Sequence, residues 1–199
     1  MRKRLSIFLL LLSSCSLGAG NLLTPKFGVE WGLGVPLYQS YHYNFLTEDY
    51  MRVDEKGKEW MMNMTGLLLG NVVCYIGKHF CLGLYFGSQG IRTDERVTPL
   101  TLRASYYISG WKKDGEFLFA EGGVGFRSHL RTTELAKLGY GHRMKLSEHI
   151  SLNFIFLIQA CFDRPRVMDR YTGQFVPWEM VRHSSAVVFS PDFCLSLEF

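Results

Sequence analysis

The sequence lacks a long apolar run outside its first residues. After Leu12, no segment reaches the roughly 18 consecutive apolar residues that a membrane-spanning helix requires. It also lacks an excess of charge of one sign. The chain has 22 basic and 18 acidic residues, and without Arg2, Lys3 and Arg4 the count is 19 against 18. The sequence therefore argues against a helical membrane protein, and it gives no support to nucleic-acid binding, which depends on a basic surface.

Cysteines are few, and their spacing fits no metal site. Cys74, Cys81, Cys161 and Cys194 follow the first 20 residues at intervals that match no zinc-binding pattern. The glycines at 122–125 precede neither a helical pattern nor Lys-Ser/Thr, so they do not indicate a phosphate-binding loop. We expect no metal and no cofactor. We also expect Cys74 and Cys81 to be reduced, with a cross-strand disulfide between them as the alternative.

The first 20 residues have the features of an export signal. Basic residues at 2–4 precede the apolar run Leu5 to Leu12, and small residues follow up to Gly20. We expect residues 1–20 to be a signal peptide and residues 21–199 to form one exported domain. The letters "LSSC" at 12–15 resemble a bacterial lipobox, so a periplasmic barrel anchored by a lipid on Cys15 stays open as an alternative.

The sequence is rich in alternation of apolar and polar residues. In "FGVEWGLGVPLY", Phe27, Val29 and Trp31 fall on one face of an extended strand, while Gly28 and Glu30 fall on the other. Such segments recur at 26–38, 64–76, 79–90, 98–110, 116–128, 135–147, 150–162 and 187–199. Each has the roughly 9–11 residues that a tilted strand needs to cross a bilayer.

The connections between these segments alternate in length. "GKH", "WKKDG" and "SEH" are short, whereas the stretches near 39–63 and 163–186 are long. Short turns on one side and long loops on the other are typical of barrels in the bacterial outer membrane. We therefore predict an all-β fold, an eight-stranded antiparallel up-and-down transmembrane β-barrel located in that membrane.

Charged residues fall on the inward face of the predicted strands. Arg103, Glu121 and Arg143 lie on successive strands and are expected to form a ladder. A barrel of eight strands is filled by its side chains, and buried charges must be paired. The predicted lumen network comprises Glu30, Arg103, Glu121, Arg143, Lys145, Asp192 and Glu198. A packed polar plug is the preferred interpretation, and a narrow ion or proton path is the alternative.

The orientation of segment 64–76 depends on the turn that follows it. A two-residue turn at Gly77 and Lys78 would suit a type II′ hairpin. It would place Cys74 opposite Cys81, and Tyr75 would then face lipid in an aromatic belt. The same register also directs Asn71 toward lipid.

The two long connections combine aromatic residues with arginine. Tyrosine, tryptophan and arginine contribute most of the contact energy at binding surfaces. The predicted loop surface consists of Tyr41, Tyr43, Arg164, Arg166, Arg170, Trp178 and Arg182. It either recognises an unknown surface ligand, or forms an aromatic belt whose arginines bind lipopolysaccharide phosphates.

One short motif suggests catalysis. His183-Ser184-Ser185 resembles the His-x-Ser fragment of outer-membrane lipid A deacylases, although Ala186 stands where that family usually has Asn. A nucleophile, its base and an orienting acid must lie within hydrogen-bond reach. By alternation, the downstream acids Asp192 and Glu198 face away from His183 and Ser185. We therefore predict no catalytic residues, and keep an acyl hydrolase using His183 and Ser185 as the alternative.

The chain closes with "SPDFCLSLEF", in which Phe193, Leu195, Leu197 and Phe199 alternate with other residues. With this ending, the mature part resembles the small eight-stranded outer-membrane barrels of Gram-negative bacteria, the OmpA transmembrane-domain and OmpX type. The resemblance implies that Leu195, Leu197 and Phe199 signal to the barrel assembly machinery, although Cys194 stands where glycine is usual. It also implies a monomeric, non-enzymatic barrel in contact with outer-membrane lipid and lipopolysaccharide, with loops for a structural or surface-binding role.

Overall fold

The computed structural model describes residues 25–47, 49–92, 95–127, 132–169 and 172–199. These residues are mostly extended, and none of their helices is both long and apolar enough to cross a membrane. One short 3-10 helix spans Trp178–Met180. The strands are β1 (Pro25–Gly34), β2 (Tyr38–Leu46), β3 (Arg52–Trp60), β4 (Thr65–Ile76), β5 (Phe80–Arg92), β6 (Glu95–Tyr107), β7 (Gly115–Phe126), β8 (Thr132–Lys145), β9 (Ser151–Asp163) and β10 (Val181–Glu198).

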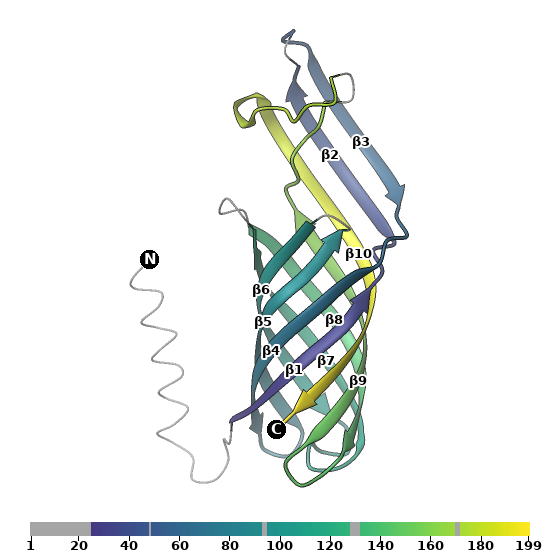
Figure 1. Cartoon of the computed structure of the whole chain (residues 1–199), viewed down its shortest axis with the longest axis vertical. Helices are drawn as coiled ribbons and strands as arrows, with labels where there is room; N and C mark the ends of the chain where they lie inside the picture. Colours follow the sequence, from purple (N-terminus) through teal and green to yellow (C-terminus); the bar gives the residue numbers. More distant parts are fainter. Residues whose placement is uncertain (1–24, 48, 93–94, 128–131, 170–171) are drawn as a thin grey trace, which may run out of the picture.

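Eight of these strands close a barrel in which every neighbouring pair is antiparallel. The order is β1-β4-β5-β6-β7-β8-β9-β10, and β10 pairs back with β1 from Gly28↔Glu198 to Gly34↔Asp192. The predicted fold class is confirmed. The short connections 77–79, 108–114 and 146–150 lie together at one end, named here the turn end, beside the end of β10 (Figure 1). The opposite end is named the rim.

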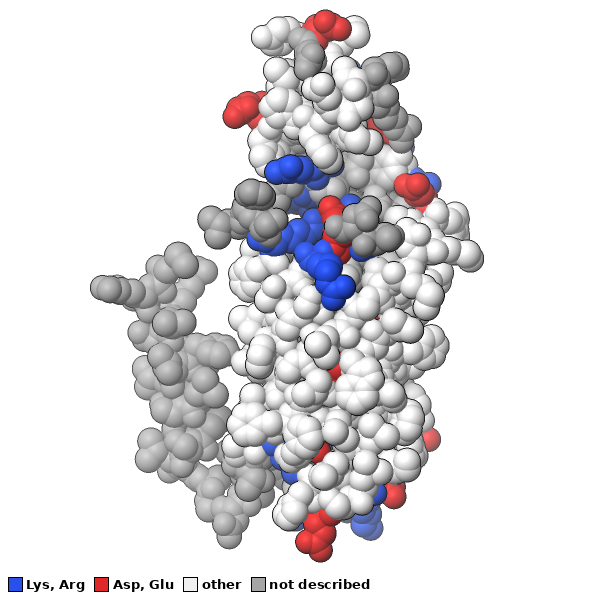
Figure 2. Space-filling model, viewed as in Figure 1, with Lys and Arg blue, Asp and Glu red and all other residues white. Residues whose placement is uncertain are grey.

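The barrel wall is apolar outside and filled inside. Outward side chains are largely exposed, for example Leu138 at 68% and Phe193 at 63%. Inward side chains such as Leu69, Tyr85 and Leu157 are buried. Between the rim and the turn end, the face drawn in Figure 2 is a broad surface with few charged side chains. Many of the exposed side chains of the wall are large and apolar, and a soluble protein rarely exposes so many together.

The structure corrects the register predicted for β4. Tyr75 pairs with Cys81 and Ile76 with Phe80, so the turn contains three residues rather than two. Because side chains alternate with a period of two, this shift of one residue turns the whole strand over. Tyr75 and Asn71 therefore face the lumen and are buried. Cys74 is more exposed than the buried Cys81, and both are free thiols.

Residues 39–60, predicted as part of a long loop, instead form a hairpin that begins at Tyr38. β2 pairs with β3 from Tyr38↔Trp60 to Leu46↔Arg52, and also with the first half of β10. The pairing with β10 continues across Pro36, which has no N–H, because Val35 N donates to Pro191 O at 3.0 Å and Leu37 N to Phe189 O at 2.9 Å. The connection between β1 and β4 thus forms a three-stranded sheet beyond the rim, together with the first half of β10 (Figure 1). This sheet is named here the raised sheet and consists of β2, β3 and residues 181–189 of β10.

Candidate functional site

Charged side chains from four strands meet inside the barrel. Arg103 on β6 donates to Glu30 Oε2 at 2.7 Å and to Glu30 Oε1 at 2.9 Å, and its Nε donates to Glu121 Oε2 at 2.7 Å. Lys137 Nζ lies 2.9 Å from Glu121 Oε1, which also accepts a hydrogen bond from Thr101 at 2.7 Å. All five side chains are buried. Two cations thus balance two carboxylates across the lumen.

Aromatic rings enclose the guanidinium of Arg103. Its Cζ lies 4.0 Å from the centre of the Tyr85 ring and 4.2 Å from that of Phe119. A planar guanidinium can stack on rings while its N–H groups bind carboxylates at its edge, which an ammonium group does not do. Charged groups and aromatic rings thus pack together inside the barrel at this level.

A second network lies toward the turn end. Arg143 Nη2 lies 2.6 Å from Glu198 Oε2, and Nη1 donates to the Tyr75 hydroxyl at 2.6 Å. The Tyr75 hydroxyl donates in turn to Glu198, and Asn153 Nδ2 donates to Glu198 Oε1 at 2.8 Å. The Trp111 ring stacks on Tyr75 at 4.3 Å, and its indole N–H donates to the Gly77 carbonyl at 2.8 Å. The turn that carries Trp111 therefore folds over this end of the lumen.

These contacts revise the predicted ladder. Glu121 pairs across the sheet with Lys137, whereas Arg143 lies six positions further along β8, opposite Gly115. The expected contact of Arg143 with Glu121 is therefore wrong, and Lys137 takes its place. Alternation along residues 135–147 directs Lys137 inward, as it does Arg143, but it does not identify a partner for either residue.

Two other predicted members of the lumen network lie apart from both clusters. Asp192 is buried and accepts a hydrogen bond from Ser190 at 2.5 Å. Lys145 is only half-buried at the end of β8, where its backbone N–H donates to Asp114 Oδ1 at 2.7 Å. Lys145 thus belongs to the turn end rather than to the plug.

A further charged cluster, which the sequence analysis did not predict, lies at the rim. Arg127 Nη2 lies 2.9 Å from Asp163 Oδ2 and 3.3 Å from Glu95 Oε2. Arg92 Nη1 lies 3.1 Å from Glu95 Oε2, and Thr133 donates to Asp163 Oδ1 at 3.2 Å. Basic and acidic side chains gather at this level in Figure 2. Ion pairs thus occur at the rim, in the middle of the lumen and toward the turn end.

The inner face of the raised sheet continues the lumen side of the barrel wall. The rings of Tyr41 and Tyr43 stack there at 4.8 Å, and the Tyr41 hydroxyl donates to Glu55 Oε1 at 3.2 Å. Ser184 donates to the Pro165 carbonyl at 2.6 Å, which ties the segment after β9 to this face. Both predicted tyrosines therefore belong to a strand, where they are half-buried.

The outer face of the raised sheet continues the exposed side of the barrel wall. It carries His42 beside Lys56 and Ser185, and Ser40 beside Lys58. His42 Nε2 lies 2.8 Å from Asp54 Oδ1, and this hydrogen bond holds the pKa of the Asp54 carboxyl below its ordinary value. Along this face runs a groove of about 620 Å³, named here the outer groove, whose lining is Ser40, Tyr41, His42, Lys56, Gly57, Lys58, Ser185, Ala186 and Val187.

The suspected catalytic pair is in contact, without the acid expected for it. His183 Nε2 lies 3.1 Å from Ser185 Oγ, and the His183 ring packs against that of His42 at 4.7 Å. Asp192 and Glu198 are buried in the lumen, where other partners engage them. Ser185, but not His183, also lines a second groove of about 490 Å³, together with Glu134, Arg164 and Trp178.

The remaining predicted residues are distributed over several surfaces. Arg164, Arg166, Trp178 and Arg182 are exposed, and Arg166 Cζ lies 5.7 Å from the centre of the Phe175 ring. Arg170 and Cys15, like the predicted signal peptide, lie outside the described residues. Phe199 is exposed on the outside of the barrel, and its N–H donates to Phe27 O at 2.8 Å. Leu195 and Leu197 alternate with the buried Cys194, Ser196 and Glu198.

Comparison with solved structures finds similarity to outer-membrane proteins. The structure of AlkL, solved by solid-state NMR in DMPC lipid bilayers, is 10% identical, with 92% of this chain and 93% of that chain covered and a TM-score of 0.42. The outer-membrane protease OmpT from Escherichia coli is 9% identical, with 92% and 100% covered and a TM-score of 0.32. Comparisons with protein-family profiles and with curated proteins give no match. Similarities this low carry no argument about function.

Proposed function

We propose that this protein is a non-enzymatic integral β-barrel of the bacterial outer membrane. In this proposal the lumen is a structural plug, and the barrel holds the raised sheet at the cell surface for a structural or ligand-binding role. One observation carries the proposal: a closed barrel with an apolar exterior and a charge-paired interior extends at one end into an ordered sheet.

The wall supports a location in a membrane. A closed barrel satisfies its backbone hydrogen bonds between strands, and this is the condition for crossing a bilayer without helices. Its outward side chains are apolar where a soluble barrel would be polar, as with Leu102 at 56% and Ile158 at 55% exposure. The outer membrane is the natural site for such a barrel, since short turns and long connections segregate to opposite ends. We place the rim outside the cell and the turn end in the periplasm.

The interior supports a plug rather than a pore. Arg103 binds Glu30 and Glu121 at once, and rings cover its guanidinium. Breaking such buried pairs leaves an uncompensated charge at a cost of about 3–5 kcal/mol. Transport through the lumen would require many of these contacts to open together.

The proposal includes several partners. Outer-membrane lipid and lipopolysaccharide would contact the apolar wall. The barrel assembly machinery would read Leu195, Leu197 and Phe199, which share the outward face of β10. We propose a monomer, because closing the barrel leaves no sheet edge in the membrane for a second copy to pair with. Any further surface ligand would be held by the raised sheet.

Location and orientation can be tested with epitope tags in intact cells. One tag would be inserted at the tip of the β2–β3 hairpin, after Asp49, and another in the turn between Lys112 and Lys113. We expect an antibody to reach the first tag on intact cells and the second only after permeabilisation. The full-length protein should also fractionate with the outer membrane and migrate differently on gels before and after heating. A protein released into the soluble fraction once its lipid anchor is removed would instead support an anchored periplasmic barrel.

An acyl hydrolase acting on lipid A is the second candidate, because His183 and Ser185 are in hydrogen-bond contact. Serine beside a histidine base is the minimum arrangement for nucleophilic acyl transfer. The test is a mass spectrum of lipid A from cells with and without the protein. Loss of an acyl chain in cells with the wild-type protein, but not with Ser185→Ala, would establish the hydrolase and refute the non-enzymatic assignment.

A further inference from the structure

Strand β3 places its lysines and its glutamates on opposite faces. Lys56 is paired with His42 across the strands, and Lys58 with Ser40, on the outer face of the raised sheet. Glu55 lies on the inner face, where it accepts the hydrogen bond from Tyr41. Because side chains alternate along a strand, Glu59 shares the inner face with Glu55. The outer face thus collects the lysines of this strand, and the inner face its glutamates.

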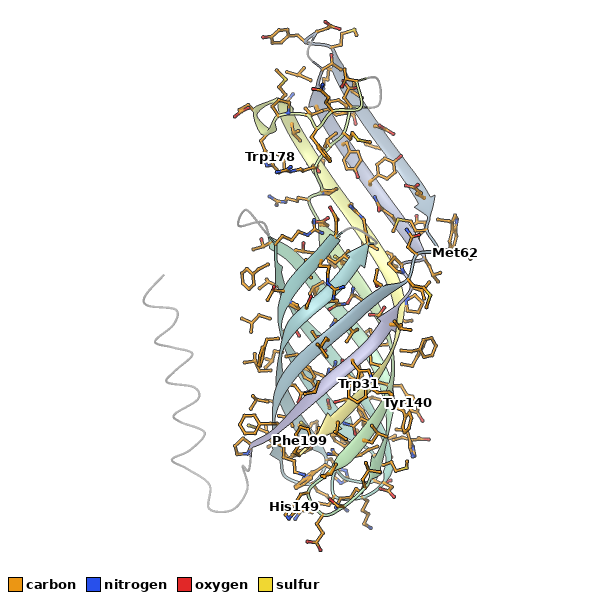
Figure 3. The ribbon with its side chains drawn as sticks, in the orientation of Figure 1. Trp31, Met62, Tyr140, His149, Trp178 and Phe199 are labelled. Atoms are coloured by element: carbon orange, nitrogen blue, oxygen red, sulfur yellow. The ribbon has the colours of Figure 1, made fainter. Side chains whose placement is uncertain are left out.

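Aromatic residues mark where the apolar wall ends beneath these lysines. The Tyr38 ring lies 5.5 Å from Trp60 and 6.3 Å from Phe189. Trp60 is 78% exposed, and Met62, which projects from the base of the hairpin in Figure 3, is 87% exposed. Aromatic girdles lie at the interfaces of membrane barrels. Lys58 stands two residues beyond this row and Lys56 four, which corresponds to about 7 Å and about 14 Å along the strand.

The chemistry of the outer groove suits an anion at this height. Lys56 and Lys58 are exposed cations that line it, and Ser40 and Ser185 contribute to the same lining. Asp54 is the acidic residue that β3 places on this face, and its carboxylate is engaged by His42 at 2.8 Å. A lysine ammonium binds a phosphate as a compact point charge, and a serine hydroxyl can add a hydrogen bond.

We propose that the outer groove binds the phosphate of an outer-leaflet glycolipid, with Lys56 and Lys58 as its charged contacts. The inference rests on the outer-membrane location proposed above. A glycolipid is the occupant that the position favours, because the groove continues the surface that would face lipid. Acyl chains against the wall would bring a headgroup phosphate to the level just beyond the aromatic row. The cations at that level complement its charge.

The test compares two charge-matched double variants in detergent solution. Lys56→Gln/Lys58→Gln removes the two charges of the outer groove. Lys78→Gln/Lys113→Gln removes two exposed charges at the turn end. Each purified protein is titrated with phosphorylated lipid A and with lipid A from which the phosphates have been removed, and the bound lipid is measured by native mass spectrometry.

We expect the wild-type protein and the turn-end variant to prefer phosphorylated lipid A. In the outer-groove variant, affinity for this lipid should fall by about 30-fold at low ionic strength, since each lysine near an anionic surface contributes about 1 kcal/mol. Affinity for the dephosphorylated lipid should stay the same in all three proteins. Competition by millimolar inorganic phosphate alone would show a free-anion site, and this would overturn the lipid assignment.

Two outcomes separate this inference from the proposed function. If all three proteins integrate into vesicles but bind both lipids equally, the phosphate site is wrong and the membrane location stands. If the wild-type protein stays soluble in the presence of vesicles, the proposed location fails, and the inference fails with it.

Discussion

Arg103 shows how one residue can join opposite walls of this barrel. Its guanidinium bridges Glu30 on β1 and Glu121 on β7, two strands on either side of the lumen. A lysine at this position could not make the same forked contact, because its ammonium lacks the planar arrangement of donors. The side chain therefore acts as a cross-brace between walls that share no backbone hydrogen bonds.

Replacing Arg103 with methionine should destabilise the protein by about 3–5 kcal/mol, because Glu30 then becomes a buried charge without its cation. The double variant Arg103→Met/Glu30→Gln should recover part of this loss. Urea unfolding of protein reconstituted in vesicles, followed by tryptophan fluorescence, measures both values. Lys113→Met at the exposed turn is the control and should change little. Equal stability of Arg103→Met and the wild-type protein would show that the network is not a structural brace.

The pKa of Asp54 provides a second test at this scale. The hydrogen bond with His42 lowers this pKa, so the contact stabilises the raised sheet above the ordinary carboxyl pKa of about 4, and the benefit is lost as the pH falls through the lowered value. In His42→Ala, the Asp54 midpoint in an NMR titration of its carboxyl carbon should rise. Ser185→Ala keeps the His42–Asp54 contact and should leave the midpoint unchanged. If the Asp54 midpoint in His42→Ala equals that of the wild-type protein, the hydrogen bond with His42 is not the cause of the lowered pKa.

Alternation in the sequence predicted which residues face inward, but not which of them touch. Arg143 was correctly directed into the lumen, yet its partner is Glu198 rather than Glu121. The stagger between neighbouring strands determines which inward side chains touch. Only the lengths of the turns indicate this stagger in the sequence. Tyr75 shows the same limit, because a turn longer by one residue moved it from the predicted lipid face to the lumen.

At the scale of elements, the β2–β3 hairpin is the main feature that sequence reasoning missed. The letters "RVDEKGKEW" of β3 contain lysine and glutamate in place of apolar alternation, so they resemble a solvated loop. The pattern fails because neither face of β3 packs into the barrel core. Its strand character comes instead from pairing with β2 along nine positions, from Tyr38↔Trp60 to Leu46↔Arg52.

The barrel should fold without this hairpin. Replacing residues 38–63 with a two-residue turn retains the pairing of β1 with β4 and with the second half of β10. We expect the shortened protein to keep its heat-dependent shift on gels and its strand content by circular dichroism. As a control, replacing residues 80–92, the whole of β5, should abolish both. Failure of the hairpin deletion to insert into vesicles would show that the raised sheet is needed for barrel assembly.

For the whole molecule, the property that decides between a plug and an ion path is how the interior packs. Paired charges lie at the rim and along the lumen, and Trp111 covers the turn end. The eight-strand architecture was predictable, because eight alternating segments and two classes of connection length are global features of the sequence. The role of the surface was not predictable, because it depends on which side chains the raised sheet brings to one face.

A filled interior predicts that the protein does not conduct ions. In planar bilayers at moderate voltage, the wild-type protein should give no stepwise currents above background. Glu121→Ala/Lys137→Ala removes one of the buried pairs and opens space while keeping the net charge. We expect this double variant to unfold at a lower urea concentration than the wild-type protein, and still to conduct no ions. Steady single-channel steps from the wild-type protein, abolished without loss of stability in the double variant, would instead establish the ion path.

β2 continues the line of β1, and β10 runs through both the barrel and the raised sheet. This continuity fixes how far the raised sheet extends beyond the rim. A nine-residue strand spans about 30 Å, and backbone hydrogen bonds hold this one in line with the wall below it. The tip of the hairpin therefore stands at a set distance from the rim of the barrel, whereas a flexible loop would sample many heights. Inserting two residues into β2 and two into β3 would lengthen the raised sheet by about 7 Å. A partner that binds the tip would then have to bind at that new height.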